Sequence, residues 1–158
     1  MYDSANDAPT PVLTEHVRIR YHQARRQELP DLIALARKVE AVHADDINAP
    51  HGLTQALEGV VAALDAHIRM EEAIVFPALA AGETAKMLGA LAGVQDDRDG
   101  RQVAKNRIAA ITHGMRLPLD ACGAWRLLYA KLGELAADLD EHMYLENDVL
   151  FSRLQAHA

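Results

Sequence analysis

Apolar residues recur at alternating steps of three and four over long stretches of the chain, which is the spacing of a helical seam. The stretch of about 53–80 carries such a seam at Leu57, Val60, Leu64, His67, Glu71 and Ile74. The stretch that follows Asp120 carries one at Leu128, Leu132, Leu135, Leu139, His142, Glu146 and Val149. A first stretch, about 12–44, aligns Ile19, His22, Leu29, Leu32, Ala36, Val39 and His43. We expect Pro30 to kink the first helix and Asp120 to cap the last.

A less regular stretch of about 83–113 completes the pattern. One face of it carries Leu91, Val94, Arg98, Ile108 and Ile111. Clusters of Gly, Pro and Asp between the four stretches mark short turns. The pattern therefore predicts an all-α fold, an antiparallel up-down four-helix bundle over residues 12–158. Residues 1–11 are polar and twice interrupted by proline, and we expect them to form a flexible tail.

Two of the seams are interrupted by the same pair of polar residues, at positions where leucine would otherwise lie. His67 precedes Glu71 by four residues, and His142 precedes Glu146 by four. In a helix, each pair directs an imidazole and a carboxylate to one side. Doubled, this donor set suits iron, manganese or zinc. We predict one metal site shared by two helices; the alternative is polar seam residues that hydrogen-bond across the bundle.

Counting residues from each turn shows which positions lie at the same height in an antiparallel bundle. The midpoints between facing candidates fall close to the three turns. One layer across all four helices then contains His22, His67 with Glu71, Arg98, and His142 with Glu146. His43 lies roughly 32 Å from His22 along an unbroken helix, so it cannot join a site with His22 unless Pro30 folds the segment back on itself.

Other polar and aromatic residues near the predicted layer are given structural roles. We expect the remaining histidines to lie on the surface or in turns: His16, His51, His113 and His157. Glu72 reads as a solvated charge on the helix surface, and Trp125 and Tyr129 as core or interface aromatics. Tyr21 and Tyr144 are sequence neighbours of ligands, and adjacent residues point away around a helix.

The composition excludes several classes of partner. A formal net charge of −7 argues against nucleic acid and anionic membranes. No apolar run approaches the length that spans a bilayer, and the chain opens with no signal-peptide pattern. Cys122 is the only cysteine, so no intrachain disulfide can form. We therefore expect a cytoplasmic protein with no membrane partner.

Several motifs resemble those of the hemerythrin-like (HHE) family, and more closely the di-iron domain of the repair-of-iron-centres proteins. They are Arg20-Tyr-His22, the 28–33 and 38–45 segments, His67-x-x-x-Glu-Glu72, Ile74-Val-Phe-Pro77, Ala121-Cys-x-x-Trp125 and His142-x-x-x-Glu-Asn147. The resemblance implies two iron ions with an oxo bridge and carboxylate bridges. It makes His22, His67 and His142 terminal ligands and Glu71 and Glu146 the bridges.

The chain departs from this family at two places. The family's third helix supplies a histidine where this chain has Arg98, and a guanidinium does not ligate iron. The second iron is then expected to be held weakly. Arg98 either pairs with a carboxylate or reaches solvent, which we favour, or it attracts an anionic or polar ligand. The family's small N-terminal domain with paired cysteines is also not found ahead of the bundle.

The resemblance implies a non-haem di-iron protein of the nitrosative and oxidative stress response. Its partners would be NO, O₂ or peroxide, or iron–sulfur proteins that receive iron for cluster repair. Turnover of NO or peroxide would make it an enzyme, which the sequence leaves open. The alternatives are a carrier or sensor of O₂, NO or iron without turnover, and a bundle whose metal site has partly decayed.

Overall fold

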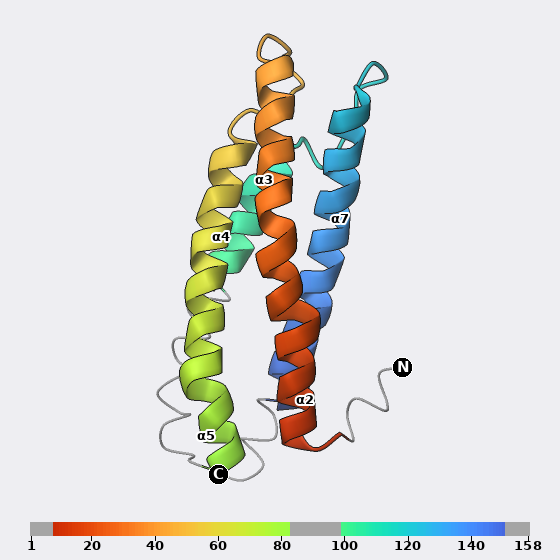
Figure 1. The fold of residues 1–158 in the computed structure, drawn as a ribbon. Coiled ribbons are helices and arrows are strands. Elements are labelled where there is room, and N and C mark those ends of the chain that lie inside the picture. Colours follow the sequence, from red (N-terminus) through yellow and green to blue (C-terminus); the bar gives the residue numbers. More distant parts are fainter. Residues whose placement is uncertain (1–7, 83–98, 151–158) are drawn as a thin grey trace.

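The computed structural model describes residues 8–82 and 99–150, apart from the side chains of residues 147 and 148. All regular structure in these ranges is helical, and four rods lie side by side with alternating direction (Figure 1). The first rod contains α2 (Thr10–Val17), η1 (Arg18–Gln23) and α3 (Ala24–Val42). The second contains α4 (Leu53–Met70), η2 (Glu71–Val75) and α5 (Phe76–Ala81). The third covers 99–111, and the last contains α7 (Gly123–Tyr144) and η3 (Leu145–Leu150).

The predicted all-α four-helix bundle is confirmed. The first rod begins at Thr10, inside the expected tail, and α3 continues through Pro30 without folding back on itself. Gly82 adopts a left-handed conformation (φ 70°) and ends α5, as glycine commonly does at a helix terminus. The expected cap at Asp120 is wrong, because α7 starts at Gly123 and Cys122 occupies the capping position.

The described residues form two apolar clusters inside the bundle, one towards each end. The larger one surrounds Trp125 and Leu128 and includes Leu32, Leu57 and Leu64. The smaller one contains Leu13, Val17, Tyr21, Val75, Phe76, Ala78, Leu145, Val149 and Leu150. Both clusters contain residues of the first, second and last rods. In each of these rods, the predicted layer of polar residues lies at the boundary between the two clusters. Trp125 and Tyr129 are core aromatics, as expected.

Within the described ranges, three segments are π-helical: η1, η2 and η3. A π-helix closes its hydrogen bonds from i to i+5, so it takes up more residues per turn than an α-helix. Apolar positions that were predicted from α-helical spacing therefore need not face the core in these segments. Ile19 in η1 and Ile74 in η2 were placed on the core face, but they are 51% and 49% exposed, whereas Val75 and Phe76 are buried.

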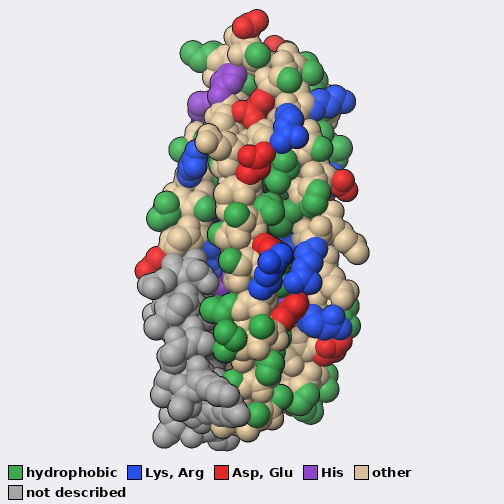
Figure 2. Space-filling view, turned by 60° about the vertical axis from the view of Figure 1, so that its left-hand side comes forward, with side chains coloured by type: hydrophobic (Ala, Val, Ile, Leu, Met, Phe, Trp, Pro, Cys, Tyr) green, Lys and Arg blue, Asp and Glu red, His purple; other side chains and the backbone are tan. Residues whose placement is uncertain are grey.

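No helix in the described ranges is long and apolar enough to cross a membrane. On the face shown in Figure 2, basic and acidic side chains lie beside one another along the rods.

The start of α4 is capped from the neighbouring helix rather than by its own residues. Glu40 of α3 accepts hydrogen bonds from the backbone N–H of Gly52 (2.5 Å) and Thr54 (3.0 Å) and from the Thr54 hydroxyl. Burial raises the pKa of a carboxyl group, but these hydrogen bonds outweigh it and hold the pKa of Glu40 below its ordinary value. The carboxylate thus joins the first two rods at their shared turn.

We predict that Glu40→Gln lowers the free energy of unfolding by about 1–2 kcal/mol at neutral pH, as measured by urea denaturation. Because the pKa of Glu40 is lowered in the folded state, its contribution is present above the unfolded pKa and is lost as pH falls through the folded pKa. The difference from the wild type should narrow towards about pH 3. Glu58→Gln, in the exposed Arg37–Glu58 pair, is the control, with an expected effect under about 0.5 kcal/mol. A Glu40 variant that matches the Glu58 control would refute the capping role.

Candidate metal centre

Three of the four rods bring the five predicted ligands into one buried layer. His22 lies in η1, His67 in the last turn of α4, Glu71 at the start of η2, His142 near the end of α7, and Glu146 in η3. None of the five is more than 3% exposed. The structure thus brings these residues together.

Arg98, the sixth residue predicted for this layer, lies outside the described residues.

The imidazole and carboxylate atoms converge on a small volume. His22 Nε2 lies 3.3 Å from Glu71 Oε2 and 3.8 Å from Glu146 Oε1. His67 Nε2 contacts Glu71 Oε1 and lies 3.6 Å from Glu146 Oε2. His142 Nε2 is hydrogen-bonded to Glu146 Oε1. One donor atom from each of His22, Glu71, His142 and Glu146 lies within 4.8 Å of the other three.

Protons bound by the imidazoles and carboxylates offset the negative charge of the two buried glutamates. Burial lowers the pKa of His22 and His67, but the carboxylates of Glu146 and Glu71 outweigh it and raise these values to about 9 and about 10. Burial and the adjacent Glu146 raise the pKa of Glu71. Burial would also raise the pKa of Glu146, but His142 and the hydrogen bonds from Glu71 and His22 hold it well below its ordinary value. Glu71 is therefore the carboxyl that more readily keeps a proton.

The donor set fits a transition-metal ion. His22 Nε2 and both carboxylate oxygens of Glu71 are buried, and their closest polar contacts are with other donor atoms of the cluster. Buried polar atoms normally find a well-formed hydrogen bond, and a bound cation would supply the partner that these contacts supply only in part. Imidazole nitrogen together with carboxylate oxygen suits iron, manganese or zinc. Divalent cations would also offset the desolvated negative charge of the two glutamates.

The π-helical segments position these ligands. Each of η1, η2 and η3 supplies one residue of the layer: His22, Glu71 and Glu146. The wider turn also changes the directions of the neighbouring side chains. Single π-helical turns inside α-helices are frequent at functional sites, and here all three occur at the height of the candidate ligands.

Tyr21 was expected to point away from the site, and the structure shows otherwise. It is fully buried, and its ring stacks on that of His142 with 4.9 Å between centroids and 7° between planes. On the other side, His22 stacks on Phe76 at 5.7 Å. The error arises because the rule for adjacent residues assumes α-helical geometry, whereas Tyr21 lies within η1. Two aromatic rings thus hold two of the imidazoles in place.

Glu72 is not simply a solvated surface charge. Its side chain is 26% exposed, and Oε1 lies 3.0 Å from His22 Nδ1. Its other oxygen pairs with Arg26 at 3.3 Å. It binds the side of the His22 ring that faces away from the cluster.

A buried arginine also lies near the layer, and the sequence pattern did not reveal it. Arg25 is 1% exposed and pairs with Glu28 at 2.9 Å and Asp138 at 3.3 Å. Asp138 precedes His142 by one helical turn, so this ion pair joins the first and last rods next to the candidate ligands. Its only sequence signal was a basic residue three positions after His22.

Three of the histidines excluded from the layer have other partners. His43 Nε2 lies 3.1 Å from Cys122 Sγ, and its ring packs on Trp125. His16 lies edge-on to Tyr21 with 6.0 Å between centroids. His51 Nε2 contacts the carbonyl of Asp46 at 2.6 Å. His157 lies outside the described residues.

Comparisons with known proteins point to one family. A family model described as the hemerythrin HHE cation binding domain matches residues 16–154. The iron-sulfur cluster repair protein YtfE of Musicola paradisiaca is 37% identical over 146 residues, which is 92% of this chain. Proteins of the same name from Edwardsiella ictaluri and Pectobacterium carotovorum subsp. carotovorum are 38% and 37% identical over 92% and 93% of the chain. In each case the match covers 66% of the relative, so the chain spans slightly less than two thirds of these proteins.

We predict that His43 is dispensable for metal binding. His43→Gln should leave the iron content per chain unchanged, whereas His67→Gln or His142→Gln should lower it, as measured by metal analysis after purification under identical conditions. His43 lies away from the candidate ligands, because it contacts Cys122 at the end of the bundle where α7 begins. Equal losses in all three variants would contradict the assignment.

The same variant has a second expected effect. The hydrogen bond from His43 is the main cause that holds the pKa of the Cys122 thiol below its ordinary value. Since the thiolate is the reactive form, His43→Gln should slow alkylation of Cys122 at neutral pH, with Cys122→Ser as the unreactive blank.

Proposed function

The chain belongs to the hemerythrin HHE cation-binding family, and on that premise we propose that it is a non-haem di-iron protein of the nitrosative and oxidative stress response. The observation that supports this most is the buried convergence of three imidazoles and two carboxylates on one small volume. Bound iron would supply redox-active coordination positions for NO, O₂ or peroxide, or would itself be the cargo delivered to a damaged iron–sulfur cluster.

Each residue of the layer has a proposed role. His22, His67 and His142 would hold the iron through Nε2, and Glu71 and Glu146, which face one another, would be shared between two ions. The two apolar clusters exclude bulk water above and below the layer. That exclusion favours small uncharged molecules such as NO and O₂ over bulky polar substrates, because entry of a polar group into the layer costs desolvation.

The repair role is supported by the names of the similar proteins, which are iron-sulfur cluster repair proteins. In a repair role, the partners of the chain are iron–sulfur proteins, and the chain must be able to release its iron to them. Arg98, at the position of the family's third-helix histidine, supports a weakly held second ion. Two positive charges about 4 Å apart repel by several kcal/mol at an effective dielectric near 20.

A carrier or sensor without turnover is the second candidate. The burial of all five residues is compatible with it, because a site closed to solvent suits reversible binding of a diatomic molecule as well as it suits chemistry. A catalyst must release a changed product from this buried site in every cycle, whereas a carrier or sensor releases the ligand unchanged. Release therefore distinguishes the two functions.

We predict that chelation of iron lowers the melting temperature, and more so at higher pH. The raised pKa values of His22 and His67 mean that their stabilising contribution is complete below about pH 6.5 and is lost as pH rises through about 9 to 10. The raised pKa of Glu71 has the same sign, since ionising that buried carboxyl costs stability. Metal binding instead strengthens as its ligands lose protons. An unchanged melting temperature after verified iron removal would refute the site.

Arg98→His serves as a gain-of-function companion to this measurement. It should raise the amount of iron that survives a chelator challenge, because it replaces a cation with a neutral donor. If the wild-type chain already retains two irons as firmly as the variant, the weak second ion is excluded.

If the iron-loaded chain is catalytic, we predict that each site consumes many molecules of NO or peroxide. An electrode trace with NO or peroxide in large excess over protein measures this directly. A single stoichiometric uptake, reversed when the gas is removed, would assign the carrier or sensor role instead. Absence of iron and of the near-UV absorption of a bridged ferric pair would exclude both. His67→Gln is the matched negative control.

A further inference from the structure

His22 has two ring nitrogens, and the proposed metal site accounts for only one of them. Nε2 faces Glu71 at 3.3 Å, inside the cluster. Nδ1 faces the other way and lies 3.0 Å from Glu72 Oε1. His22 is fully buried, whereas the Glu72 side chain is 26% exposed. Glu72 thus extends from the surface of the second rod to a buried ring on the first.

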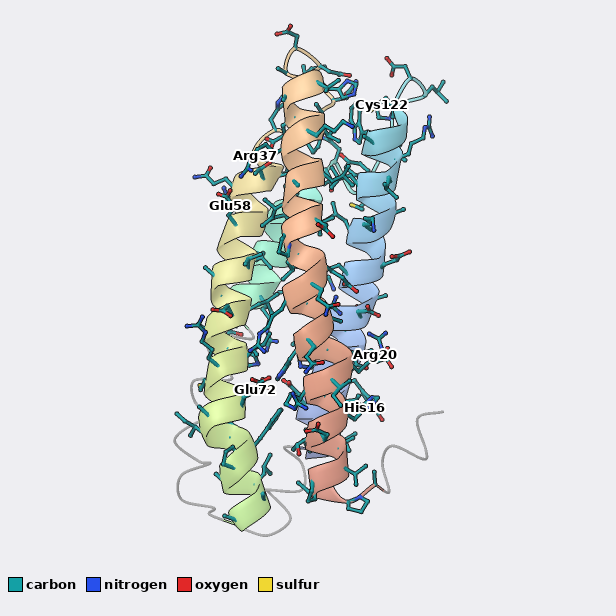
Figure 3. All side chains as sticks on the ribbon, in the orientation of Figure 1. His16, Arg20, Arg37, Glu58, Glu72 and Cys122 are labelled. Atoms are coloured by element: carbon teal, nitrogen blue, oxygen red, sulfur yellow. The ribbon has the colours of Figure 1, made fainter. Side chains whose placement is uncertain are left out.

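Glu71 and Glu72 are adjacent in η2, yet they contact opposite nitrogens of the same imidazole. Figure 3 labels Glu72 on the second rod, on the side that faces the rod of Arg20 and His16. Its other oxygen, Oε2, lies 3.3 Å from Arg26 Nη2, and Arg26 is one turn beyond His22. The carboxylate is therefore shared between a buried ring and a surface guanidinium.

We propose that Glu72 is a positioning residue for His22. It accepts the Nδ1–H hydrogen bond, which fixes the ring orientation and leaves Nε2 as the nitrogen that can bind a cation. A neutral imidazole carries one N–H, so whichever nitrogen donates leaves the other as the ligand. A carboxylate behind a ligating histidine also increases its basicity, and loss of such a partner typically costs 10–100-fold in metal affinity. The effect on metal affinity rests on the proposed function, whereas the hydrogen bond can be tested without any metal.

Arg26 moderates this interaction. Its guanidinium withdraws charge from the same carboxylate, so removal of Arg26 leaves Glu72 a stronger acceptor for His22. Substitutions at the two residues should consequently shift metal affinity in opposite directions. If Glu72 and Arg26 formed only a structural ion pair on the surface, loss of either residue would have the same small effect on metal affinity.

The chain contains a matched control on the same two rods. Arg37 of α3 and Glu58 of α4 form an exposed pair at 3.0 Å, and Figure 3 shows them well above Glu72. Glu58→Gln removes the same charge from the same kind of inter-helix pair, far from His22. Any effect of Glu72→Gln that Glu58→Gln reproduces is an effect of net charge or of surface pairing.

The test uses Glu72→Gln, Glu72→Ala, Arg26→Gln and Glu58→Gln in the full chain. Competition with a chelator measures iron affinity. Glu72→Ala should weaken it about 10–100-fold, and Glu72→Gln should weaken it less, because the amide oxygen can still accept the Nδ1–H bond. Arg26→Gln should leave affinity unchanged or raise it, and Glu58→Gln should leave it unchanged. Glu72→Ala within about twofold of the wild type would overturn the positioning of the ligand.

A second readout needs no metal. In the iron-free chain, the proton on His22 Nδ1 should give a ¹⁵N-coupled resonance that is protected from solvent exchange. Its protection from exchange should persist in Glu58→Gln and Arg26→Gln and be lost in Glu72→Ala, because, among the described residues, only Glu72 accepts the hydrogen bond from Nδ1. If the wild-type chain binds no iron but shows this protection and its loss in Glu72→Ala, the proposed function fails and the hydrogen bond stands. If the proton is equally protected in Glu72→Ala, the role of Glu72 is refuted whatever the metal content.

Discussion

The structure depends on two carboxylates, Glu71 and Glu146, that face one another in a layer shielded from solvent. Two buried negative charges at close range are unfavourable unless protons or cations neutralise them. The three surrounding imidazoles provide partial compensation, and the pKa values of His22 and His67 rise accordingly. Among the described residues, the layer accordingly takes its donors from His and Glu, which bind protons and metals alike, and apolar side chains cover it above and below.

The rods meet that requirement by local changes in helix geometry and by support from outside the layer. The three π-helical segments turn His22, Glu71 and Glu146 towards one another. Tyr21 and Phe76 stack on two of the imidazoles, and Arg25 joins the first and last rods through Asp138. Away from the layer, ordinary apolar packing stabilises the fold, and Trp125 belongs to the larger of the two clusters.

Much of this arrangement could be predicted because it follows from spacing. The repeat of His67 and Glu71 as His142 and Glu146 identifies the candidate layer, and counting from the turns brings in His22. What spacing could not predict depends on side-chain direction inside non-α-helical turns, which affects Ile19, Ile74, Tyr21 and Glu72. Contacts between residues far apart in sequence, such as His43 with Cys122, also give no periodic signal.

The π-helical segments have a consequence for insertions and deletions in this chain. A turn with i to i+5 hydrogen bonds holds one residue more than the α-helical turn that could replace it. Deletion of one residue from η2 would let an α-helical turn close in its place, and the residues beyond it would keep nearly the same phase. Phe76 would then stay on the apolar cluster that it now completes, whereas the direction of Glu71 within the turn would change. The same deletion inside α4 would instead rotate everything beyond it by about 100°. The π-helical turns are therefore the positions where a change of one residue alters the ligands and spares the apolar core beyond them.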